Sequence, residues 1–237
     1  ILGAAGNNAI GIAGVSWQVS IMPLKFIGAD GFGSDADAIA AIEYSGAMGA
    51  RISNNSWSGP DFSQALLDAI NGVAESSLFV TSAASSDSNN DLYPPYPASF
   101  DAPNVVAVTS TDANDQLAPS ANYGPTSVDL GAPGVSILST MPGNTYGLLS
   151  GTSMAAPQVC GAAALILAIY PDIDVLSLKN LLLATTDPLP SLAGKTVSGG
   201  RLNAYRPLAV PDHTAPGAIQ DLAADIPHSN SVTLTWT

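Results

Sequence analysis

Seven residues near the middle of the chain, followed at once by an apolar run, constrain its fold more than any other stretch. Gly151 to Pro157 reads GTSMAAP, and no charged residue follows until after Tyr170. The apolar run predicts a buried helix that begins near Ser153. A helix N-terminus offers free backbone N–H groups and the positive end of the helix dipole, and both suit an oxyanion. The stretch can therefore present a nucleophilic serine, although a Thr or Ser cap on a core helix is the commoner meaning of a lone Gly-Thr-Ser.

Strands and helices alternate along the rest of the chain. Strands are expected over 20–26, 51–57, 78–83, 104–110 and from 128, and helices from Ser34 or Asp35, over 62–75, over 152–169 and over 174–186. Residues 135–141 and 145–149 are expected to pair as a hairpin across Pro142-Gly143-Asn144. The alternation predicts an α/β fold with a mostly parallel β-sheet flanked by helices on both faces.

Composition limits the classes of partner. The chain has 237 residues, of which 46% are apolar and 11% charged, as in a compact globular domain. A net charge of -13 disfavours nucleic acid and anionic membranes as partners. The stretch from Gly161 to Tyr170 is too short to span a bilayer, so we expect no membrane partner, and we expect a monomer. The single cysteine, Cys160, excludes a disulfide within the chain and is interpreted as a small core residue.

The GTSMAAP stretch resembles the nucleophile signature of the subtilisin-like serine proteases, and the resemblance covers nearly all of residues 1–209. It implies a subtilisin-like fold that is incomplete at its N-terminus. It also implies a serine endopeptidase that hydrolyses peptide bonds through an acyl-enzyme on Ser153. Its substrates would be proteins or peptides, and its chemistry would need no cofactor. The low lysine and cysteine contents fit a secreted enzyme.

Two further stretches resemble the walls of the substrate cleft in that family. Gly31-Phe32-Gly33 is similar to the edge segment that pairs with an extended peptide, where backbone hydrogen bonds give affinity and pockets give specificity. Ser56-Trp57-Ser58-Gly59 is similar to the opposite wall of the primary specificity pocket, and Ser82-Ala83-Ala84 would line the same pocket. Either wall, taken alone, would be an ordinary turn. Their order and their spacing to Ser153 favour the cleft.

The groups that would activate Ser153 are not found in the order that the family implies. A serine hydroxyl is a poor nucleophile unless a histidine takes its proton and an acid orients that histidine. In the family these groups precede the serine. The chain has only His213 and His228, both after Ser153, and we interpret both as solvated linker residues.

Truncation is the expected explanation for the missing groups. The family's His-Gly-Thr-His motif would end just before Ile1, and its Asp motif would lie further upstream. We therefore expect residues 1–237 alone to be inactive. The alternative is a pseudoprotease, which would bind extended peptides without cleaving them.

A second departure concerns the oxyanion hole. Ser85 stands where the resemblance leads us to expect an asparagine after the strand 78–83. Serine offers a shorter arm with one rotating hydroxyl, whereas asparagine offers an amide group with two hydrogens. Loss of that donor lowers turnover about 100- to 1000-fold in a member of the family, so the change predicts a slow enzyme. A shifted loop in which Asn89 or Asn90 donates is the less favoured alternative.

Residues 6–12 resemble a loop that binds calcium in many relatives. The side chain of Asn8 and the carbonyls of Gly6, Ile10 and Ile12 would face one ion, and oxygen ligands of this kind suit a hard cation. The carboxylate that completes the site in relatives would lie upstream of Ile1. An empty turn is therefore the expected state of this loop, and a structural calcium ion is the alternative.

The end of the chain differs in character from the rest. Residues 199–205 resemble the end of the peptidase domain, where a short last helix is expected, and 210–216 form a proline-bearing linker. Residues 217–237 resemble the opening strands of a fibronectin type III module, since Val232, Leu234 and Trp236 alternate with threonines. The expected organisation has three parts. A peptidase domain over 1–209, which lacks the Asp and His segments, is followed by the linker over 210–216 and by a partial module over 217–237. Two strands alone do not make a stable sandwich.

Overall fold

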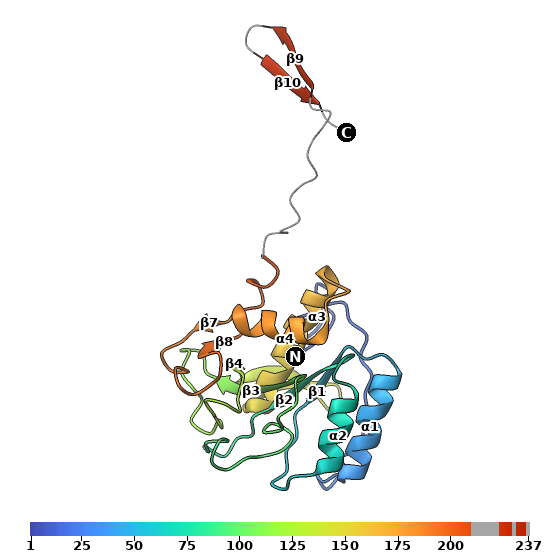
Figure 1. Ribbon diagram of the computed structural model, residues 1–237, viewed down its shortest axis with the longest axis vertical. Helices are drawn as coiled ribbons and strands as arrows, with labels where there is room; N and C mark the ends of the chain where they lie inside the picture. The colour runs from blue at the N-terminus through green and yellow to red at the C-terminus, as the bar shows by residue number, and fades with distance from the viewer. Residues whose placement is uncertain (210–222, 229–230, 236–237) are drawn as a thin grey trace.

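The computed structural model describes residues 1–209, 223–228 and 231–235, and its centre is a six-stranded sheet (Figure 1). The order across the sheet is β1 (Ile52–Asn55), β2 (Leu78–Ser82), β3 (Val105–Thr111), β4 (Leu130–Pro133), β8 (Gly200–Arg201) and β7 (Asp187–Pro188). Neighbours are parallel from β1 through β8, and β7 alone runs antiparallel. The predicted α/β fold with a mostly parallel sheet is confirmed.

Two pairs of helices cover the two faces of this sheet (Figure 1). Helices α1 (Asp35–Ala47) and α2 (Gln64–Gly72) pack on one face, and α3 (Thr152–Ile169) and α4 (Val175–Ala184) pack on the other. Successive side chains of a strand point to opposite faces. Phe79 of β2 accordingly lies in the core under α1 and α2, while Leu78 and Val80 lie in the core under α3.

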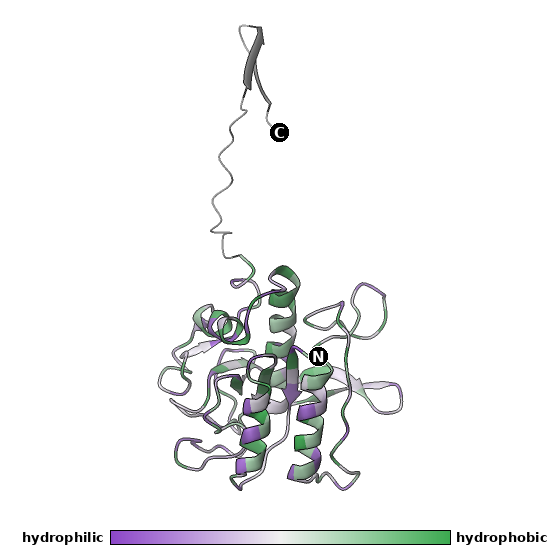
Figure 2. Ribbon diagram, turned by 45° about the vertical axis from the view of Figure 1, so that its right-hand side comes forward, coloured by the Kyte–Doolittle hydropathy of each residue, from purple (hydrophilic) through white to green (hydrophobic). Residues whose placement is uncertain are grey.

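Helices α1, α2 and α4 each begin at a residue whose side chain caps the helix. Ser34 caps α1 by accepting a hydrogen bond from the Asp37 N–H, which settles the choice between Ser34 and Asp35. Ser63 caps α2, and Asp174 caps α4, each by accepting a backbone N–H of the first turn. Figure 2 shows purple and green residues interspersed along α1 and α2, as expected for helices with one face in solvent.

Helix α3 is the central helix of the fold. Its observed bounds, Thr152–Ile169, are those predicted, and it packs against β1, β2, β3 and β4. By length and composition it is also long and apolar enough to cross a membrane, alone among the helices that the structure describes. Val159, Cys160 and Ile166 are fully buried against the sheet, so the role of α3 as a core helix explains its apolar composition.

Several predicted elements differ from the structure. Helix α2 is shorter than the predicted 62–75, and β1 ends two residues before the predicted Trp57. Residues 20–26 form no strand, because a strand needs a neighbour to share its backbone hydrogen bonds, and a groove of about 960 Å³ lies between this segment and β1. Residues 199–205 form β8 and a turn instead of a short helix. Strand β4 begins at Leu130, two residues later than expected. The hairpin is confirmed as β5 (Ile137–Met141) and β6 (Thr145–Leu149).

The last described residues form a separate pair of strands. β9 (Ala223–His228) and β10 (Ser231–Thr235) pair antiparallel. β10 coincides with the second strand expected in the tail. The linker, His213 and the first expected strand, over 215–222, lie outside the described residues, so the fibronectin type III resemblance stays a prediction. His228, which the sequence indicates as a linker residue, is instead the last residue of β9 and lies opposite Ser231.

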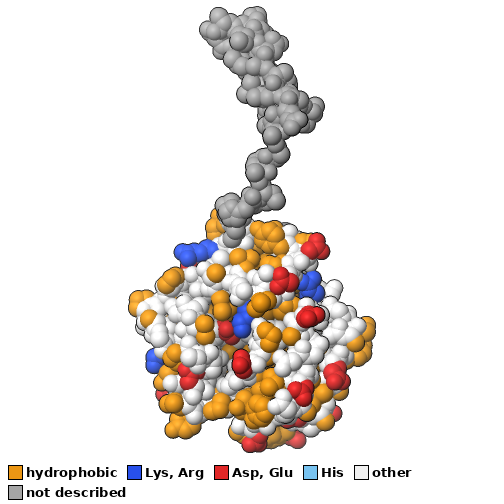
Figure 3. All heavy atoms as spheres, viewed as in Figure 1, with side chains coloured by type: hydrophobic (Ala, Val, Ile, Leu, Met, Phe, Trp, Pro, Cys, Tyr) orange, Lys and Arg blue, Asp and Glu red, His pale blue; other side chains and the backbone are white. Residues whose placement is uncertain are grey.

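The face of the molecule drawn in Figure 3 carries scattered acidic side chains and few basic ones among hydrophobic and uncharged groups. This distribution agrees with the excess of 19 acidic over 6 basic residues in the sequence. The prediction that nucleic acid is not a partner stays a prediction.

Candidate active site

Ser153 lies in the first turn of α3, where tight backbone packing fixes the helix start. The capping residue, Gly151, has φ 150 and ψ 167, a conformation that side-chain-bearing residues rarely adopt. The Gly151 N–H donates to the Gly134 carbonyl at 2.8 Å, just after β4. A methyl group added to Gly134 would lie 2.7 Å from the Gly151 carbonyl oxygen, so glycine is needed at this contact too.

The first N–H groups of α3 are used unequally. The Thr152 N–H donates to the Ser85 hydroxyl at 3.3 Å, and the Met154 N–H donates to the Gly151 carbonyl at 3.0 Å. Within the described residues, the N–H and the hydroxyl of Ser153 have no hydrogen-bond partner. The Ser153 N–H is therefore free to stabilise an oxyanion that forms on a substrate attacked by the Ser153 oxygen.

Ser85 caps α3 from another part of the chain. Gly151 has no side chain to cap the helix, and the Ser85 hydroxyl takes that role from 67 residues away. The Ser85 oxygen also lies 3.2 Å from the hydroxyl oxygen of Thr152, a residue with no exposed surface. The sequence predicts Ser85 at the oxyanion position, and the structure places it beside the start of the nucleophile helix, engaged with Thr152.

Two buried asparagines hold the loop that carries Ser85. The Asn122 side-chain oxygen accepts the N–H of Ser86 at 2.7 Å and the N–H of Ser88 at 3.2 Å. The Asn122 amide donates to the Asn90 side-chain oxygen at 2.9 Å, and the Asn90 amide donates to the Ala83 carbonyl at 2.9 Å. The Asn90 amide is thus engaged within its own loop, which argues against Asn90 as the donor in the shifted-loop alternative. The sequence marks Asn122-Tyr123-Gly124 as a structural landmark of the family, but it does not reveal these hydrogen bonds, because they join residues that lie far apart in the chain.

Asp91 joins the same loop to the neighbouring turn. Its carboxylate accepts the N–H of Thr126 at 3.2 Å, and the N–H and hydroxyl of Ser127. Burial raises the pKa of Asp91, but these hydrogen bonds from Ser127 and Thr126 outweigh it and leave the pKa below its ordinary value. Asp91 therefore acts as a structural acceptor.

An aromatic pair joins the Ser56–Gly59 wall to the segment that leads into the other predicted wall. Phe26, which precedes the Gly31-Phe32-Gly33 segment, meets Trp57 edge-to-face with ring centroids 5.2 Å apart. The Trp57 indole N–H also donates to the Asn55 side chain at 3.3 Å. Gly59 exchanges two backbone hydrogen bonds, each 2.8 Å, with Tyr96. These contacts fix the Ser56–Gly59 wall.

The predicted pocket residues differ in accessibility. The side chains of Ser82 and Ala83 are buried, and Ala84 is half-buried with φ 75. Phe32 is 79% exposed beside Gly31 and Gly33. Ala84 and Phe32 are therefore accessible from solvent, whereas Ser82 and Ala83 support the wall from inside.

The predicted calcium loop lacks the ligands that a calcium ion needs. The Asn8 side-chain oxygen accepts the Ile10 N–H at 3.1 Å, which turns it toward its own loop. The first carboxylate in the sequence is Asp30, and calcium sites usually include carboxylates. Across the described part of the chain, no group of three or more His, Cys, Asp or Glu residues could hold a metal ion. The residues present do not fit a calcium ion by themselves, and an empty turn stays the prediction, with a structural calcium ion as the alternative.

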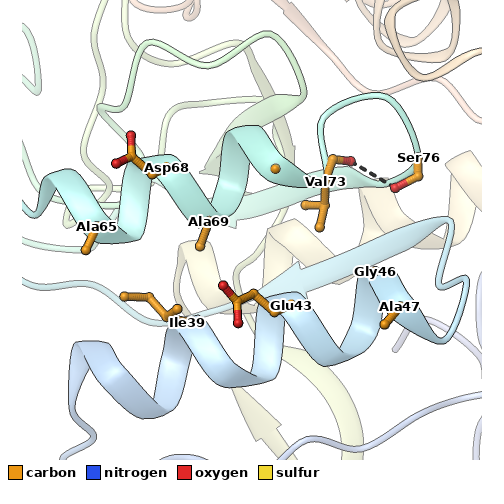
Figure 4. Close-up of a pocket in the computed structure, with 10 residues that line it drawn as sticks. Ile39, Glu43, Gly46, Ala47, Ala65, Asp68, Ala69, Val73 and Ser76 are labelled. Carbon is orange, nitrogen blue, oxygen red and sulfur yellow. Dashed lines mark hydrogen bonds between the residues drawn. The ribbon is translucent and has the colours of Figure 1, made fainter.

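Two further features of the described structure take no part in this site. An open pocket of about 640 Å³ lies between α1 and α2, and Figure 4 shows small side chains and the two acids Glu43 and Asp68 around it. None of the predicted site residues lines this pocket. The thiol of Cys160 donates to the Asn54 side chain at 3.6 Å, and complete burial raises its pKa. Cys160 is therefore the core residue that the sequence predicts.

Comparison with known proteins agrees with this geometry. The model of the subtilase family matches residues 1–212. Subtilisin DY of Bacillus licheniformis is 38% identical over 190 residues, which cover 78% of this chain and 68% of the relative. Subtilisin Savinase of Lederbergia lenta is 36% identical over 188 residues, with 79% and 68% covered. A solved protease of Pseudoalteromonas arctica PAMC 21717 matches with a TM-score of 0.80 and 28% identity, over 88% of this chain and 68% of that one.

Proposed function

Because the chain belongs to the subtilase family, a family of serine peptidases, we propose that residues 1–209 form the nucleophile-bearing part of a secreted serine endopeptidase. The observation that carries the proposal is the free N–H and hydroxyl of Ser153 at the start of α3. Both groups lie where the ends of β2 and β4 hold the helix start through Ser85 and Gly134.

The reaction begins when the Ser153 oxygen attacks the carbonyl carbon of a peptide bond. A bond forms between the two atoms, and the carbonyl electron pair moves onto the carbonyl oxygen. The Ser153 N–H donates to that oxyanion, and Ser85 contributes weakly because its oxygen is engaged with Thr152. A histidine takes the proton of Ser153 and passes it to the leaving amine, which leaves an acyl-enzyme for water to hydrolyse.

We assign the histidine and its acid to sequence outside residues 1–237. Residues 1–209 contain no histidine, and the two in the tail follow Ser153 instead of preceding it. In the described structure β1 has a strand neighbour on one side only, and its other side borders the 960 Å³ groove. The groove is lined mainly by apolar residues of segment 19–26, α1 and α3. An unpaired strand edge beside an apolar groove suits an added strand, which would bring further residues to the site.

The substrate is an extended stretch of a protein or peptide, bound between the Gly31–Gly33 and Ser56–Gly59 walls. Hydrogen bonds in the manner of an added strand would come from the backbone groups of Gly31–Gly33 that their own turn does not use, because the Phe32 N–H and carbonyl are engaged with Asp30 and Gly28. Ala84 and Phe32 are the wall residues that can contact substrate side chains.

The test is the reaction of Ser153 with a fluorophosphonate, measured in two polypeptides: residues 1–237, and the same chain extended upstream as its gene encodes it. We expect labelling only in the extended chain, and its loss in Ser153→Ala. Casein hydrolysis by residues 1–237 that disappears in Ser153→Ala would overturn the assignment of the base. Absence of labelling in the folded, extended chain would overturn the endopeptidase itself.

A second candidate, a pseudoprotease, is favoured by one observation, the engagement of Ser85 with Thr152. This reading predicts that the extended chain binds peptides without cleaving them. Fluorescence anisotropy of a labelled peptide, combined with mass spectrometry of the same sample, separates the two functions.

We also propose that a linker over 210–216 joins the peptidase domain to the start of a fibronectin type III-like module over 217–237. Limited proteolysis tests the boundary, and we expect the first cut between Ala209 and Gly217. A first cut within residues 1–209 would place the boundary elsewhere.

A further inference from the structure

Helix α3 contains a proline where the hydrogen bond to the nucleophile residue would be. In an α-helix, the N–H of each residue donates to the carbonyl four residues earlier. The residue that would donate to the Ser153 carbonyl is Pro157, which has no N–H and is buried inside α3. The carbonyl of Ser153 is therefore the one in the first turn that loses its helical partner to this proline.

A hydroxyl from a neighbouring strand occupies the vacant place. The Ser56 hydroxyl donates to the Ser153 carbonyl at 3.0 Å, from 97 residues earlier in the chain. Ser56 directly follows β1, so the strand sets its position. A proline ring also crowds the carbonyl four residues before it, which tilts that carbonyl out of the helix toward an outside donor.

The direction of the Ser56 hydrogen is set by a second contact. The Asn54 side-chain amide donates to the Ser56 oxygen at 3.2 Å, and the Asn54 side-chain oxygen accepts from the Cys160 thiol at 3.6 Å. A serine hydroxyl has one hydrogen. Because the Asn54 amide can only donate here, that hydrogen is left for the Ser153 carbonyl.

We infer that Ser56 is a positioning residue for the nucleophile, and that its hydroxyl replaces the hydrogen bond that Pro157 cannot donate. The inference rests on the proposed function, because it names a residue that aims Ser153. Ser56 fixes the carbonyl side of Ser153, while Ser85 fixes the preceding N–H through Thr152. The free N–H and hydroxyl between these two contacts are thereby held in one direction.

The sequence allows this hydrogen bond to be observed directly. Of the four methionines, only Met154 follows a serine. Protein labelled with carbonyl-¹³C serine and ¹⁵N methionine therefore gives one cross-peak, from the Ser153 carbonyl and the Met154 N–H, in a spectrum that correlates the two. Because loss of a hydrogen bond shields a carbonyl carbon, we expect an upfield ¹³C shift in Ser56→Ala and an almost unchanged shift in Ser56→Thr. Ser58→Ala removes an exposed hydroxyl from the same wall and serves as the matched control.

Pro157→Ala tests the replacement itself. Alanine supplies the missing N–H, so the Ser153 carbonyl regains its helical partner. We expect Ser56→Ala to move the Ser153 signal clearly less in the Pro157→Ala background than in the parent chain. An equal shift in both backgrounds, or no shift in Ser56→Ala alone, would overturn the inference.

The consequence for the nucleophile is measured in the upstream-extended chain. We expect Ser56→Ala to slow fluorophosphonate labelling of Ser153 by about five- to tenfold, which corresponds to the net loss of one hydrogen bond, and Ser56→Thr to restore it. Labelling at the parent rate in Ser56→Ala would contradict a positioning role. If no variant is labelled, the proposed function fails, while the carbonyl shifts still decide whether Ser56 replaces the missing bond.

Discussion

The start of α3 and the outer edge of β1 lie near one another, but they differ in how many of their backbone groups have partners in the described structure. Around Ser153 the backbone groups of the helix start are held by Ser56, Ser85 and Gly134, each at or near the end of a strand. Along β1 the described structure has no strand on the outer side, only the groove beside residues 19–26. The difference teaches that the nucleophile can be set in place independently of the groups that activate it.

The largest expected effect is a loss of stability, and it compares the packing of the core under α3 with the packing beside the groove. Ile166 of α3 is fully buried, whereas Ile21 lines the groove and is 64% exposed. We expect Ile166→Ala to lower the free energy of unfolding by about 2–5 kcal/mol, and Ile21→Ala to change it by less than about 0.5 kcal/mol. Urea denaturation measures both, and similar losses for the two variants would show that the groove side is as well packed as the α3 side.

The next effect concerns the loop that carries Ser85. Asn122→Ala removes one buried side chain that accepts from Ser86 and Ser88 and donates to Asn90, so we expect a loss of about 2–3 kcal/mol in the free energy of unfolding. Asn114→Ala, at an exposed side chain with no hydrogen bond in the described residues, is the matched control. A loss in Asn122→Ala no larger than in the control would mean that the loop is held by other contacts.

Removal of the helix cap supplied by Ser85 is expected to have a smaller effect. Ser85→Ala leaves the Thr152 N–H without its acceptor, and loss of a helix cap costs about 1 kcal/mol. We expect faster hydrogen exchange at the Thr152 amide than in Ser120→Ala, which alters an exposed serine outside α3. Unchanged exchange at Thr152 would remove Ser85 from the set of groups that fix the helix start.

The smallest expected effect concerns Asp187 of β7, at the other end of the sheet, which forms ion pairs with Arg201 and Arg206. The hydrogen bond from Asn203, together with Arg201 and Arg206, outweighs burial and holds the pKa of Asp187 below its ordinary value. The ionised carboxylate therefore stabilises the fold above the ordinary pKa of an aspartate, and this contribution disappears as the pH falls toward the lowered pKa. We expect Asp187→Asn to lower the free energy of unfolding by less than about 1 kcal/mol at pH 7.

Measurement of unfolding across the acid range checks the sign of this effect. The parent chain and Asp187→Asn should converge in stability as the pH falls. A difference that grows toward low pH would contradict the assignment.

Local sequence patterns predicted the elements that local physics determines. The bounds of α3 follow from an apolar run behind a glycine, and the start of α1 follows from its serine cap. The helix predicted over 62–75 is found over Gln64–Gly72, with a cap at Ser63 that the sequence prediction did not name. The segment 20–26 was predicted wrongly because its composition suits a strand, but a strand also needs a partner. The two-residue strands β7 and β8 are too short to leave a pattern.

The site was predictable in its centre and not in its supports. Ser153 stands in a motif, so sequence alone proposes it as the nucleophile. The roles of Ser56, Ser85 and Asn122 depend on contacts across 97, 67 and 36 residues. No pattern within a short window encodes such contacts, and each becomes visible only when parallel strands bring their ends together.

Because residues at the ends of strands hold the helix start at Ser153, the position of an insertion or deletion decides whether it disturbs the site. Ile52 lies opposite Leu78 in the pairing of β1 with β2, and a slip by one residue would move Ser56 by about 3.3 Å relative to Ser85. That slip exceeds what a hydrogen bond tolerates. An insertion or deletion within either strand would thus misdirect Ser153 from a distance. In the loop between β2 and β3, by contrast, the exposed stretch between its two anchors, Asp91 and Tyr96, can change in length while both anchors keep their contacts.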